Sequence, residues 1–388
     1  MRVIQVVSSI AAESSGPSYS VPRLCGGLKA VGVDVELHVP EPVPAVDYSF
    51  KVFRYPRKTL FHLRGAEWSP SLKQALCREC ANTDVIHTNG LWMIPNVYAA
   101  KASKGTKCKL VTAPRGSLAT WALGFRKMKK RVIGRLIGQY AAMRATDMWH
   151  ATSEKEYGEI RAAGFRQPVA IVPIGIDLPM MSVANKQKAG CRKHGMSRLV
   201  FFGRLHKVKA VDNLILAWEL VADRFKNWEL IIAGPDGGIR DELESLVATR
   251  KIPRVSFLGE LNGVAKYEYL AAADLCVLPS YTENFGVTVA ESLACGTPVV
   301  ASQGTPWRGL AENGAGWWIP IGVHPLVEQL RQSLAYSTDE LMKMGTRGRE
   351  WMARDFSWIG IGAKMRTSYD WLLGRCERPD WVKVAGNE

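Results

Sequence analysis

The feature that most restricts the possible folds is a strand–turn–helix pattern that recurs along nearly the whole chain. In its clearest copy, an apolar run at 275–278 leads through a polar turn into a helix that ends at Gly296, and another apolar run follows. Apolar runs that alternate with helices are typical of parallel strands buried on both faces, with helices crossing over them. We therefore expect an α/β fold built on parallel sheets.

The same pattern restarts halfway along the chain, which predicts two domains of one type. Strands are expected at 2–8 and again at 198–202, and the Lys-rich stretch 178–195 between the two halves has no apolar periodicity. A length of 388 residues also favours two cores over one. We expect two doubly wound, Rossmann-like parallel sheets that face each other across a cleft. The expected parts are an N-terminal domain at 1–178, a C-terminal domain at 179–358, and a helical tail at 359–388 that crosses back to the N-terminal domain.

Two acids mark the most informative turn of the second domain. Glu283 follows a strand, and Glu291 is expected about two turns inside the next helix, so the two carboxylates cannot share one proton. Each is expected to hold a separate hydroxyl-bearing group. The helix start would present the backbone amides of Phe285, Gly286 and Val287, which favours a bound phosphate. This layout matches the sugar, diphosphate and ribose of a nucleotide sugar.

Basic residues and glycines follow the other strands of this domain. Arg204 and Lys209 come after its first strand, and a glycine-rich turn at 234–238 comes after its second. Such turns meet at the carboxyl edge of a parallel sheet, where open α/β sheets bind ligands, so we expect these cations to neutralise a diphosphate. A leaving group stabilised in this way needs no metal, and no DxD pair stands in a plausible position. We expect neither a metal nor a cofactor.

The N-terminal domain offers polar residues at equivalent places. His87 and Asn89 end one expected strand, and Arg115 follows the next, which suggests an acceptor site. A single histidine there is either structural or functional, and the sequence leaves both interpretations open. Arg115 cannot act as a base because its guanidinium stays protonated, but it could bind the phosphate of a lipid-linked acceptor. Gly16 is the only glycine of the first loop, so no dinucleotide fingerprint is present; the loop is a plain connection or faces the cleft.

The formal charge of +15 predicts a polyanionic partner. Residues 125–135, from Phe125 to Arg135, carry six basic side chains that alternate with apolar ones at near-helical spacing. This pattern predicts an amphipathic helix on an anionic membrane surface, although a solvated helix face would look the same. Nucleic acid is less favoured as a partner, because no recognised module or aromatic interleaving accompanies the charge.

Other bulk features favour a cytoplasmic protein at the inner face of the membrane. No apolar run reaches the roughly 18 residues that span a bilayer, and the first residues read as a buried strand rather than a secretory segment. The eight cysteines are scattered, as in reduced cytosolic proteins. Cys77 and Cys80 form a single CxxC, which we interpret as two helical residues with no joint role.

Together these motifs resemble those of family 4 retaining glycosyltransferases of the GT-B fold. The resemblance covers almost the whole chain and is most specific in the second half. The segments that carry it there are the E-x7-E pair Glu283/Glu291, Phe-Phe-Gly-Arg-Leu with its lysine (201–209), Ala-Gly-Pro (233–235), Leu-Gly (258–259), 280–286 and 294–298. In the first half, 87–92, 114–118 and 121–123 are similar to bacterial polysaccharide transferases, and so is the final segment 371–381.

The resemblance implies roles for individual residues. It implies catalytic roles for Glu283, Arg204 and Lys209, with the two cations on the donor diphosphate and Glu283 on the transferring sugar. Glu291 would bind the ribose, and Leu258 would lie by the base. The other donor-binding residues implied are Gly16, Gly203, Gly234, Pro235, Asn284, Phe285, Gly286 and Val287. Many relatives have two glycines where this chain has Ser15-Gly16, and a histidine where it has Arg115.

The function that follows is a retaining, metal-independent hexosyltransferase of surface polysaccharide or lipopolysaccharide synthesis. It would move a sugar from a UDP- or GDP-sugar to a glycan or lipid-linked acceptor. The resemblance implies that the leaving phosphate deprotonates the acceptor, so no protein nucleophile is needed. Alternatives are a nucleotide-sugar epimerase acting without acceptor, a phosphorylase that would need a pyridoxal-bound lysine, and a non-catalytic nucleic-acid-binding protein.

Overall fold

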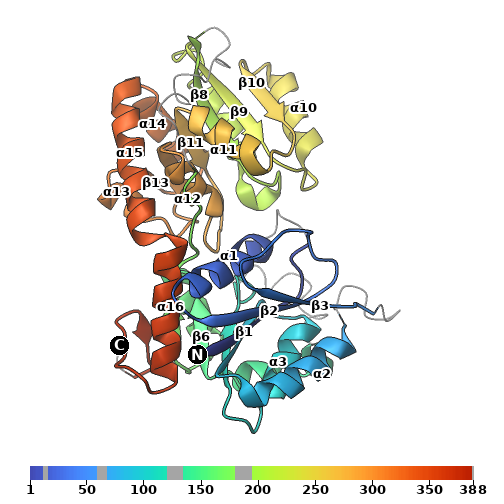
Figure 1. Cartoon of the computed structure of the whole chain (residues 1–388). Coiled ribbons are helices and arrows are strands. Elements are labelled where there is room, and N and C mark those ends of the chain that lie inside the picture. The colour runs from blue at the N-terminus through green and yellow to red at the C-terminus, as the bar shows by residue number, and fades with distance from the viewer. Residues whose placement is uncertain (12–15, 59–67, 120–133, 180–194, 387–388) are drawn as a thin grey trace. The chain divides into compact units, whose positions relative to one another are not determined.

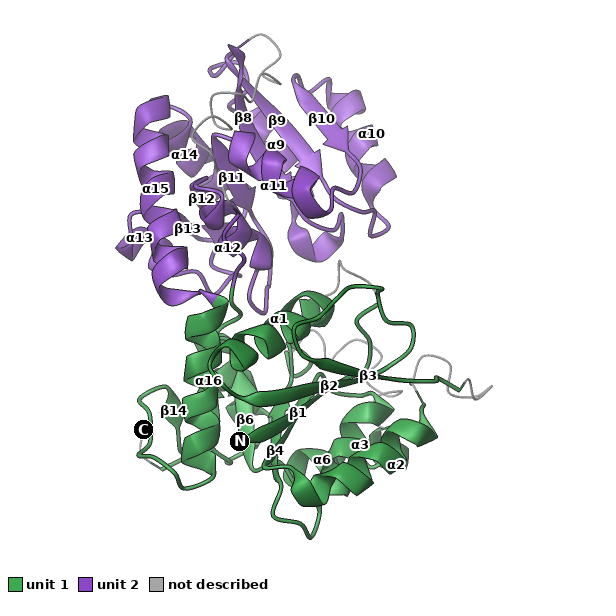
Figure 2. Cartoon of the chain, in the orientation of Figure 1, with its two compact units in different colours: residues 1–175, 358–388 green, residues 176–357 purple. Residues whose placement is uncertain are grey.

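The computed structural model describes residues 1–11, 16–58, 68–119, 134–179 and 195–386 (Figure 1). The chain forms two compact units (Figure 2). Unit 1 contains residues 1–175 and 358–388, and unit 2 contains residues 176–357. The chain therefore enters unit 2 just before the Lys-rich stretch 178–195 and returns to unit 1 for its last helix and strand.

Unit 1 is built on an eight-stranded sheet of order β14-β7-β6-β5-β4-β1-β2-β3. All neighbouring strands are parallel except β14, which runs antiparallel to β7. The strands are β1 (Arg2–Val7), β2 (Asp34–Pro40), β3 (Lys51–Tyr55), β4 (Val85–Asn89), β5 (Lys109–Ala113), β6 (Met148–Ala151), β7 (Val169–Ile171) and β14 (Val382–Lys383). The described helices are α1 (Gly16–Ala30), α2 (Pro70–Glu79), η1 (Cys80–Asn82), α3 (Ile94–Ser103), α6 (Gln139–Arg144), α7 (Glu154–Ala162) and α16 (Trp358–Leu372).

Unit 2 is built on a six-stranded, fully parallel sheet of order β10-β9-β8-β11-β12-β13. Its strands are β8 (Ser197–Phe202), β9 (Trp228–Ala233), β10 (Val255–Leu258), β11 (Leu275–Leu278), β12 (Val299–Ser302) and β13 (Gly316–Ile319). Its described helices are η3 (Lys207–Lys209), α9 (Val211–Glu219), α10 (Arg240–Arg250), α11 (Gly263–Ala272), α12 (Val287–Ala294), α13 (Gly309–Glu312), α14 (Val323–Ser333) and α15 (Thr338–Asp355).

The strand order confirms the α/β fold with two parallel-sheet domains. In each unit the chain starts at a central strand, winds outward to one side, and then crosses over to wind outward on the other. The order reverses between β1 and β4 in unit 1, and between β8 and β11 in unit 2. Ligands of doubly wound sheets bind outside the carboxyl ends of the strands at such a reversal.

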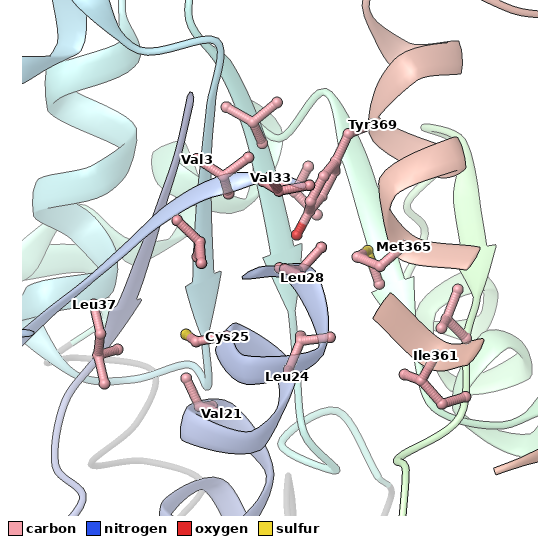
Figure 3. Packing of buried hydrophobic residues seen from close by; sticks show 14 of the residues in the cluster. Val3, Val21, Leu24, Cys25, Leu28, Val33, Leu37, Ile361, Met365 and Tyr369 are labelled. Atoms are coloured by element: carbon pink, nitrogen blue, oxygen red, sulfur yellow. The ribbon is translucent and has the colours of Figure 1, made fainter. Parts of the chain in front are cut away.

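The last long helix, α16, completes the core of unit 1 by packing against α1. Leu24 and Leu28 of α1 belong to the same buried cluster as Met365 and Tyr369 of α16 (Figure 3). A Cβ added to Gly27 of α1 would lie 2.2 Å from the carbonyl oxygen of Trp358, so only glycine allows the two backbones to approach this closely. The described helices include none that is long and apolar enough to cross a membrane.

This contact predicts opposite outcomes for two neighbouring glycines of α1. Gly27→Ala should lower the free energy of unfolding by about 1–3 kcal/mol, because the new methyl group overpacks the crossing with α16. Gly26→Ala is the matched control, since a Cβ there meets nothing within 4 Å. It should be neutral or raise stability by about 0.5–1 kcal/mol through helix propensity. Urea unfolding of both variants checks this, and equal stability of the two would contradict the packing argument.

Candidate functional site

The reversal of strand order in unit 2 brings together two of the residues predicted from the sequence. Lys209 ends the short helix η3, in the connection that follows β8, and Glu283 lies in the turn that follows β11. The Nζ atom of Lys209 is 2.5 Å from Oε1 of Glu283. The same carboxylate oxygen accepts a 2.7 Å hydrogen bond from the hydroxyl of Ser280. Both members of the ion pair are mostly buried, with 21% and 13% of their side chains exposed.

Helix α12 begins later than the sequence suggested. Gly286 caps it in a left-handed conformation (φ 75°), so the helix starts at Val287 and Glu291 lies about one turn inside it, not two. The first free amides of the helix are therefore those of Val287 and Thr288, while Phe285 and Gly286 belong to the preceding turn. Glycine adopts this backbone conformation without the steric cost that a Cβ would bring.

Buried contacts hold the turn from Ser280 to Gly286 in place. The amide of Tyr281 donates to the carbonyl of Val208, which ties the turn to the connection that carries Lys209. The amide of Glu283 donates to Gly304 on the other side. The indole of Trp307 donates to the carbonyl of Phe285 at 2.5 Å. The turn is therefore held by two other segments of unit 2, the connection after β8 and residues 304–307 after β12.

Glu291, the second acid, has its own lysine, which the sequence reasoning missed. Lys266 of α11 places Nζ 2.5 Å from Oε2 of Glu291, whose side chain is 6% exposed. Burial of an unpaired carboxylate is costly, and this lysine gives Glu291 a partner of opposite charge. The one sequence feature that could have indicated it is a lysine on an otherwise largely apolar helix, directly before the strand that leads to Glu283.

The remaining predicted donor residues of unit 2 lie at the ends of its other strands. Gly203 follows β8, and Gly234 and Pro235 follow β9. A Cβ on Gly234 would be 2.0 Å from the carbonyl oxygen of Gly203, so these two turns lie directly against each other. Arg204 is exposed and makes no ion pair with the residues that the structure describes. Two further predicted residues, Leu258 at the end of β10 and Asn284 next to Glu283, are partly buried.

Of the predicted acceptor-side residues, His87 does not reach the surface. Its side chain lies in the core of unit 1, where Nδ1 is 2.7 Å from the hydroxyl of Tyr369 and Nε2 is 3.3 Å from His150. Asn89 is also buried and is 1% exposed. These two residues are corrected to structural ones, because a group enclosed on all sides cannot touch an acceptor.

Arg115, in contrast, is partly exposed and lies just beyond the end of β5. Its guanidinium donates to Oδ1 of Asn89 from Nη2 at 2.8 Å and from Nε at 3.3 Å. Its backbone has a φ of 54°, a strained value for a residue with a Cβ, and such strain often marks functional positions. Burial lowers the pKa of Arg115, and the nearby Glu156 carboxylate opposes this.

Two other predictions have different outcomes. Gly16 was expected in a loop but is the first residue of α1 in unit 1. The basic segment 125–135 falls almost entirely outside the described residues, of which only Gly134 and Arg135 are described. No group of three or more metal-ligating side chains is found among the described residues.

Each half of the chain matches a family of known proteins. Residues 184–351 match the family described as "Glycosyl transferases group 1", and residues 14–179 match "Glycosyltransferase Family 4". A D-inositol 3-phosphate glycosyltransferase of Actinosynnema mirum is 31% identical over 43% of this chain and 44% of that protein. A GDP-mannose-dependent alpha-(1-6)-phosphatidylinositol dimannoside mannosyltransferase of Mycobacterium tuberculosis is 31% identical over 45% and 48%. The chain thus spans about half the length of these curated relatives.

Solved structures share the fold over nearly the full length. Sucrose-phosphate synthase from Thermosynechococcus elongatus superposes with a TM-score of 0.76 at 21% identity, covering 97% of this chain and all of that one. Anabaena HepE in complex with UDP and glucose gives 0.71 at 18% identity, covering 95% and 99%. WaaG, a glycosyltransferase involved in lipopolysaccharide biosynthesis, gives 0.67 at 19% identity, covering 96% and 100%. The fold is therefore GT-B.

The buried histidines of unit 1 predict a loss of stability in acid. Burial lowers the pKa of His150 to about 3 and that of His87 well below its ordinary value. The folded state prefers the neutral form of both rings, so above the unfolded pKa of about 6.5 neither ring lowers the free energy of unfolding. As pH falls from about 6.5 toward 3, each ring lowers the free energy of unfolding by about 1.4 kcal/mol per pH unit.

Urea unfolding between pH 7 and 4.5 measures this dependence. His150→Gln should make the slope of unfolding free energy against pH shallower. His324→Gln, at a histidine whose side chain is 87% exposed in unit 2, is the control for the substitution itself. A stability that stays constant across this window in the unmodified chain would contradict the neutral, buried state of both histidines.

Proposed function

We propose that this chain, built from a Glycosyltransferase Family 4 domain and a Glycosyl transferases group 1 domain, transfers a hexose from a nucleoside diphosphate sugar to an acceptor. The observation that carries the proposal is the contact of Lys209 with Glu283 at the reversal point of unit 2, next to the first amides of α12. The pair supplies a cation for the diphosphate and a carboxylate for the sugar hydroxyls, and a single hydrogen bond joins these two groups.

Lys209 can serve the diphosphate without leaving Glu283. An ammonium group has three N–H donors, and Glu283 Oε1 occupies one of them. The other two remain for phosphate oxygens that sit at the start of α12, where free amides and the helix dipole favour negative charge. The exposed Arg204 adds a second cation from the same connection. Glu291, held by Lys266, would accept the ribose hydroxyls.

The reaction is proposed to retain the anomeric configuration and to need no metal. As the bond from the sugar to the nucleotide breaks, negative charge grows on the leaving phosphate, and Lys209, Arg204 and the helix amides stabilise it. That phosphate takes the proton of the acceptor hydroxyl, whose oxygen forms the new bond to the anomeric carbon on the same face of the sugar. No protein nucleophile is required, in agreement with the ion-paired, mostly buried state of Glu283.

The names of the relatives support UDP- or GDP-linked hexoses as donors. One curated relative is GDP-mannose-dependent, and a structural neighbour binds UDP and glucose. The acceptor is proposed to be a glycan or a lipid-linked glycan of bacterial surface polysaccharide or lipopolysaccharide synthesis. Arg115 would bind an anionic group of that acceptor, since the residue is partly exposed and its guanidinium keeps donors unused by Asn89. The epimerase alternative is not favoured, because the relatives and neighbours named above are transferases and a synthase.

The site assignment is tested by replacing Glu283. Glu283→Ala should lower the rate of nucleoside diphosphate release from the donor by about 100-fold or more, the usual effect of losing a preorganised electrostatic group. Glu260→Ala is the matched control, because Glu260 is exposed after β10 at the same edge of the sheet. Thermal unfolding verifies that both variants fold. Unchanged turnover in Glu283→Ala would refute the assignment.

The basic segment 125–135 is proposed to place the enzyme on the inner face of the cytoplasmic membrane. Vesicle flotation should show binding to anionic liposomes that weakens as salt rises, because added ions screen the attraction. Replacing Lys129, Lys130 and Arg131 by glutamine should weaken this binding, by about 1 kcal/mol for each charge removed near the surface. Equal binding to neutral and anionic vesicles would contradict the electrostatic basis of the proposal.

A further inference from the structure

A line of polar side chains crosses the core of unit 1, starting at Arg115. Nη2 of Arg115 donates to Oδ1 of Asn89 at 2.8 Å, and Nδ2 of Asn89 donates to Oε1 of Gln5 at 2.9 Å. Nε2 of Gln5 then donates to the hydroxyl of Tyr369 at 3.1 Å. Gln5 and Tyr369 are fully buried and Asn89 nearly so, so bulk water does not compete for these bonds.

The line continues through two histidines to a backbone carbonyl. The hydroxyl of Tyr369 lies 2.7 Å from Nδ1 of His87, and Nε2 of His87 lies 3.3 Å from Nδ1 of His150. Nε2 of His150 lies 2.8 Å from the carbonyl oxygen of Val172. This line of six consecutive hydrogen bonds connects β1, β4, β6 and the returning helix α16. Beside it, Nε2 of Gln5 also lies 3.2 Å from Nδ1 of His87.

Its last partner fixes the direction of the chain at one end. The Val172 carbonyl can only accept, so His150 must carry its proton on Nε2. Because burial keeps His150 neutral, its Nδ1 is an acceptor, and His87 must donate to it from Nε2. The Nδ1 of a neutral His87 is then an acceptor as well, so the hydroxyl of Tyr369 donates to it.

The first partner fixes the same direction from the other end. A guanidinium can only donate, so Arg115 must face the oxygen of the Asn89 amide. The amide nitrogen of Asn89 then faces Gln5, whose own nitrogen faces the oxygen of Tyr369. The two derivations meet at Tyr369 without conflict: its oxygen accepts from Gln5 while its proton goes to His87. Aligned bonds of this kind polarise and strengthen one another.

We propose that Gln5, Tyr369, His87 and His150 are positioning residues that hold the Arg115 guanidinium in one orientation toward an anionic group of the acceptor. That Arg115 faces an anionic acceptor rests on the proposed function. That these residues orient Arg115 rests on the six hydrogen bonds. Glu156 also attracts Arg115, but its two oxygens accept hydrogen bonds from the amides of neighbouring residues.

Tyr369 links the last helix of the chain to this line of hydrogen bonds. Its ring projects from α16 into the core beside Leu28 and Met365 (Figure 3). The last helix of the chain thereby acts on a side chain at the end of β5, far from it in sequence. The backbone of Arg115 is strained, and its side chain is held by Asn89. The remaining N–H donors of Arg115 therefore point in one defined direction.

Nitrogen-15 NMR of the protein with labelled histidine and arginine tests the direction of these hydrogen bonds without any variant. At pH 7 both His87 and His150 should be neutral and carry their proton on Nε2. A proton on Nδ1 of either ring, or an imidazolium, would overturn the proposal.

The positioning effect is tested by Tyr369→Phe, which keeps the ring and removes the central hydroxyl. Rotation about the Nε–Cζ bond of Arg115 should become faster by about tenfold, as expected when a hydrogen bond to a charged group is weakened. Ser368→Ala is the matched control, because it removes a buried hydroxyl of α16 that bonds to Lys364 and Trp381 instead. Equal rotation rates in the two variants would overturn the positioning role.

Titration with inorganic phosphate separates this inference from the proposed function. Phosphate should shift the Arg115 Nε resonance, with weaker affinity in Tyr369→Phe than in Ser368→Ala. The histidine tautomers and rotation rates can be as predicted while phosphate leaves Arg115 unaffected. In that case the acceptor role of Arg115 is wrong, and its positioning by the buried hydrogen bonds stands.

Discussion

A parallel sheet sends the end of every strand to the same edge, and this chain applies that constraint twice. Where the strand order of unit 2 reverses, between β8 and β11, the two following connections lie next to each other. Their contact is the Lys209–Glu283 ion pair, supported by the backbone bond from Tyr281 to Val208. Everything proposed for donor binding depends on this contact, because it joins a cation to the carboxylate that we propose for the sugar, just before the start of a helix.

Charge compensation is the second principle of the site. Both acids of the E-x7-E pair have a lysine at 2.5 Å, Lys209 for Glu283 and Lys266 for Glu291. Two buried carboxylates without partners would repel a diphosphate and would also be costly to enclose. Paired with lysines, they keep their oxygens available for hydroxyl groups while the local charge stays near zero. In the proposed function, a diphosphate would then meet the exposed Arg204 and the donors of Lys209 that Glu283 does not use.

Much of this could be predicted from the sequence, and the failures have identifiable physical causes. Apolar runs and their spacing predicted the parallel strands, and residue types at strand ends predicted Lys209 and Glu283. The sequence could not show that Gly286 takes a left-handed conformation and delays α12, because glycine is compatible with either outcome. It also missed the lysine of α11, since side-chain pairing between helices depends on packing.

His87 illustrates the limit best. It stands at the end of a strand, where a functional residue is expected, and nothing in the local sequence distinguishes it from one. One of the groups that enclose it is Tyr369 of α16, 282 residues further along the chain. Arg115, at the end of the next strand, remains partly exposed and receives its orientation through the same buried groups. Local sequence thus indicated which residues follow a strand but not which of their side chains reaches the surface.

The most direct test of the account is thermal unfolding of the full-length chain with UDP-, GDP- and ADP-linked hexoses. A ligand that binds only the folded state raises its stability, by about 2.7 kcal/mol at a hundredfold excess over Kd. We predict that a UDP- or GDP-sugar raises the midpoint and that Lys209→Met removes most of the shift. If none of these nucleotide sugars stabilises the unmodified chain, unit 2 is not a nucleotide-sugar site and the central claim is wrong.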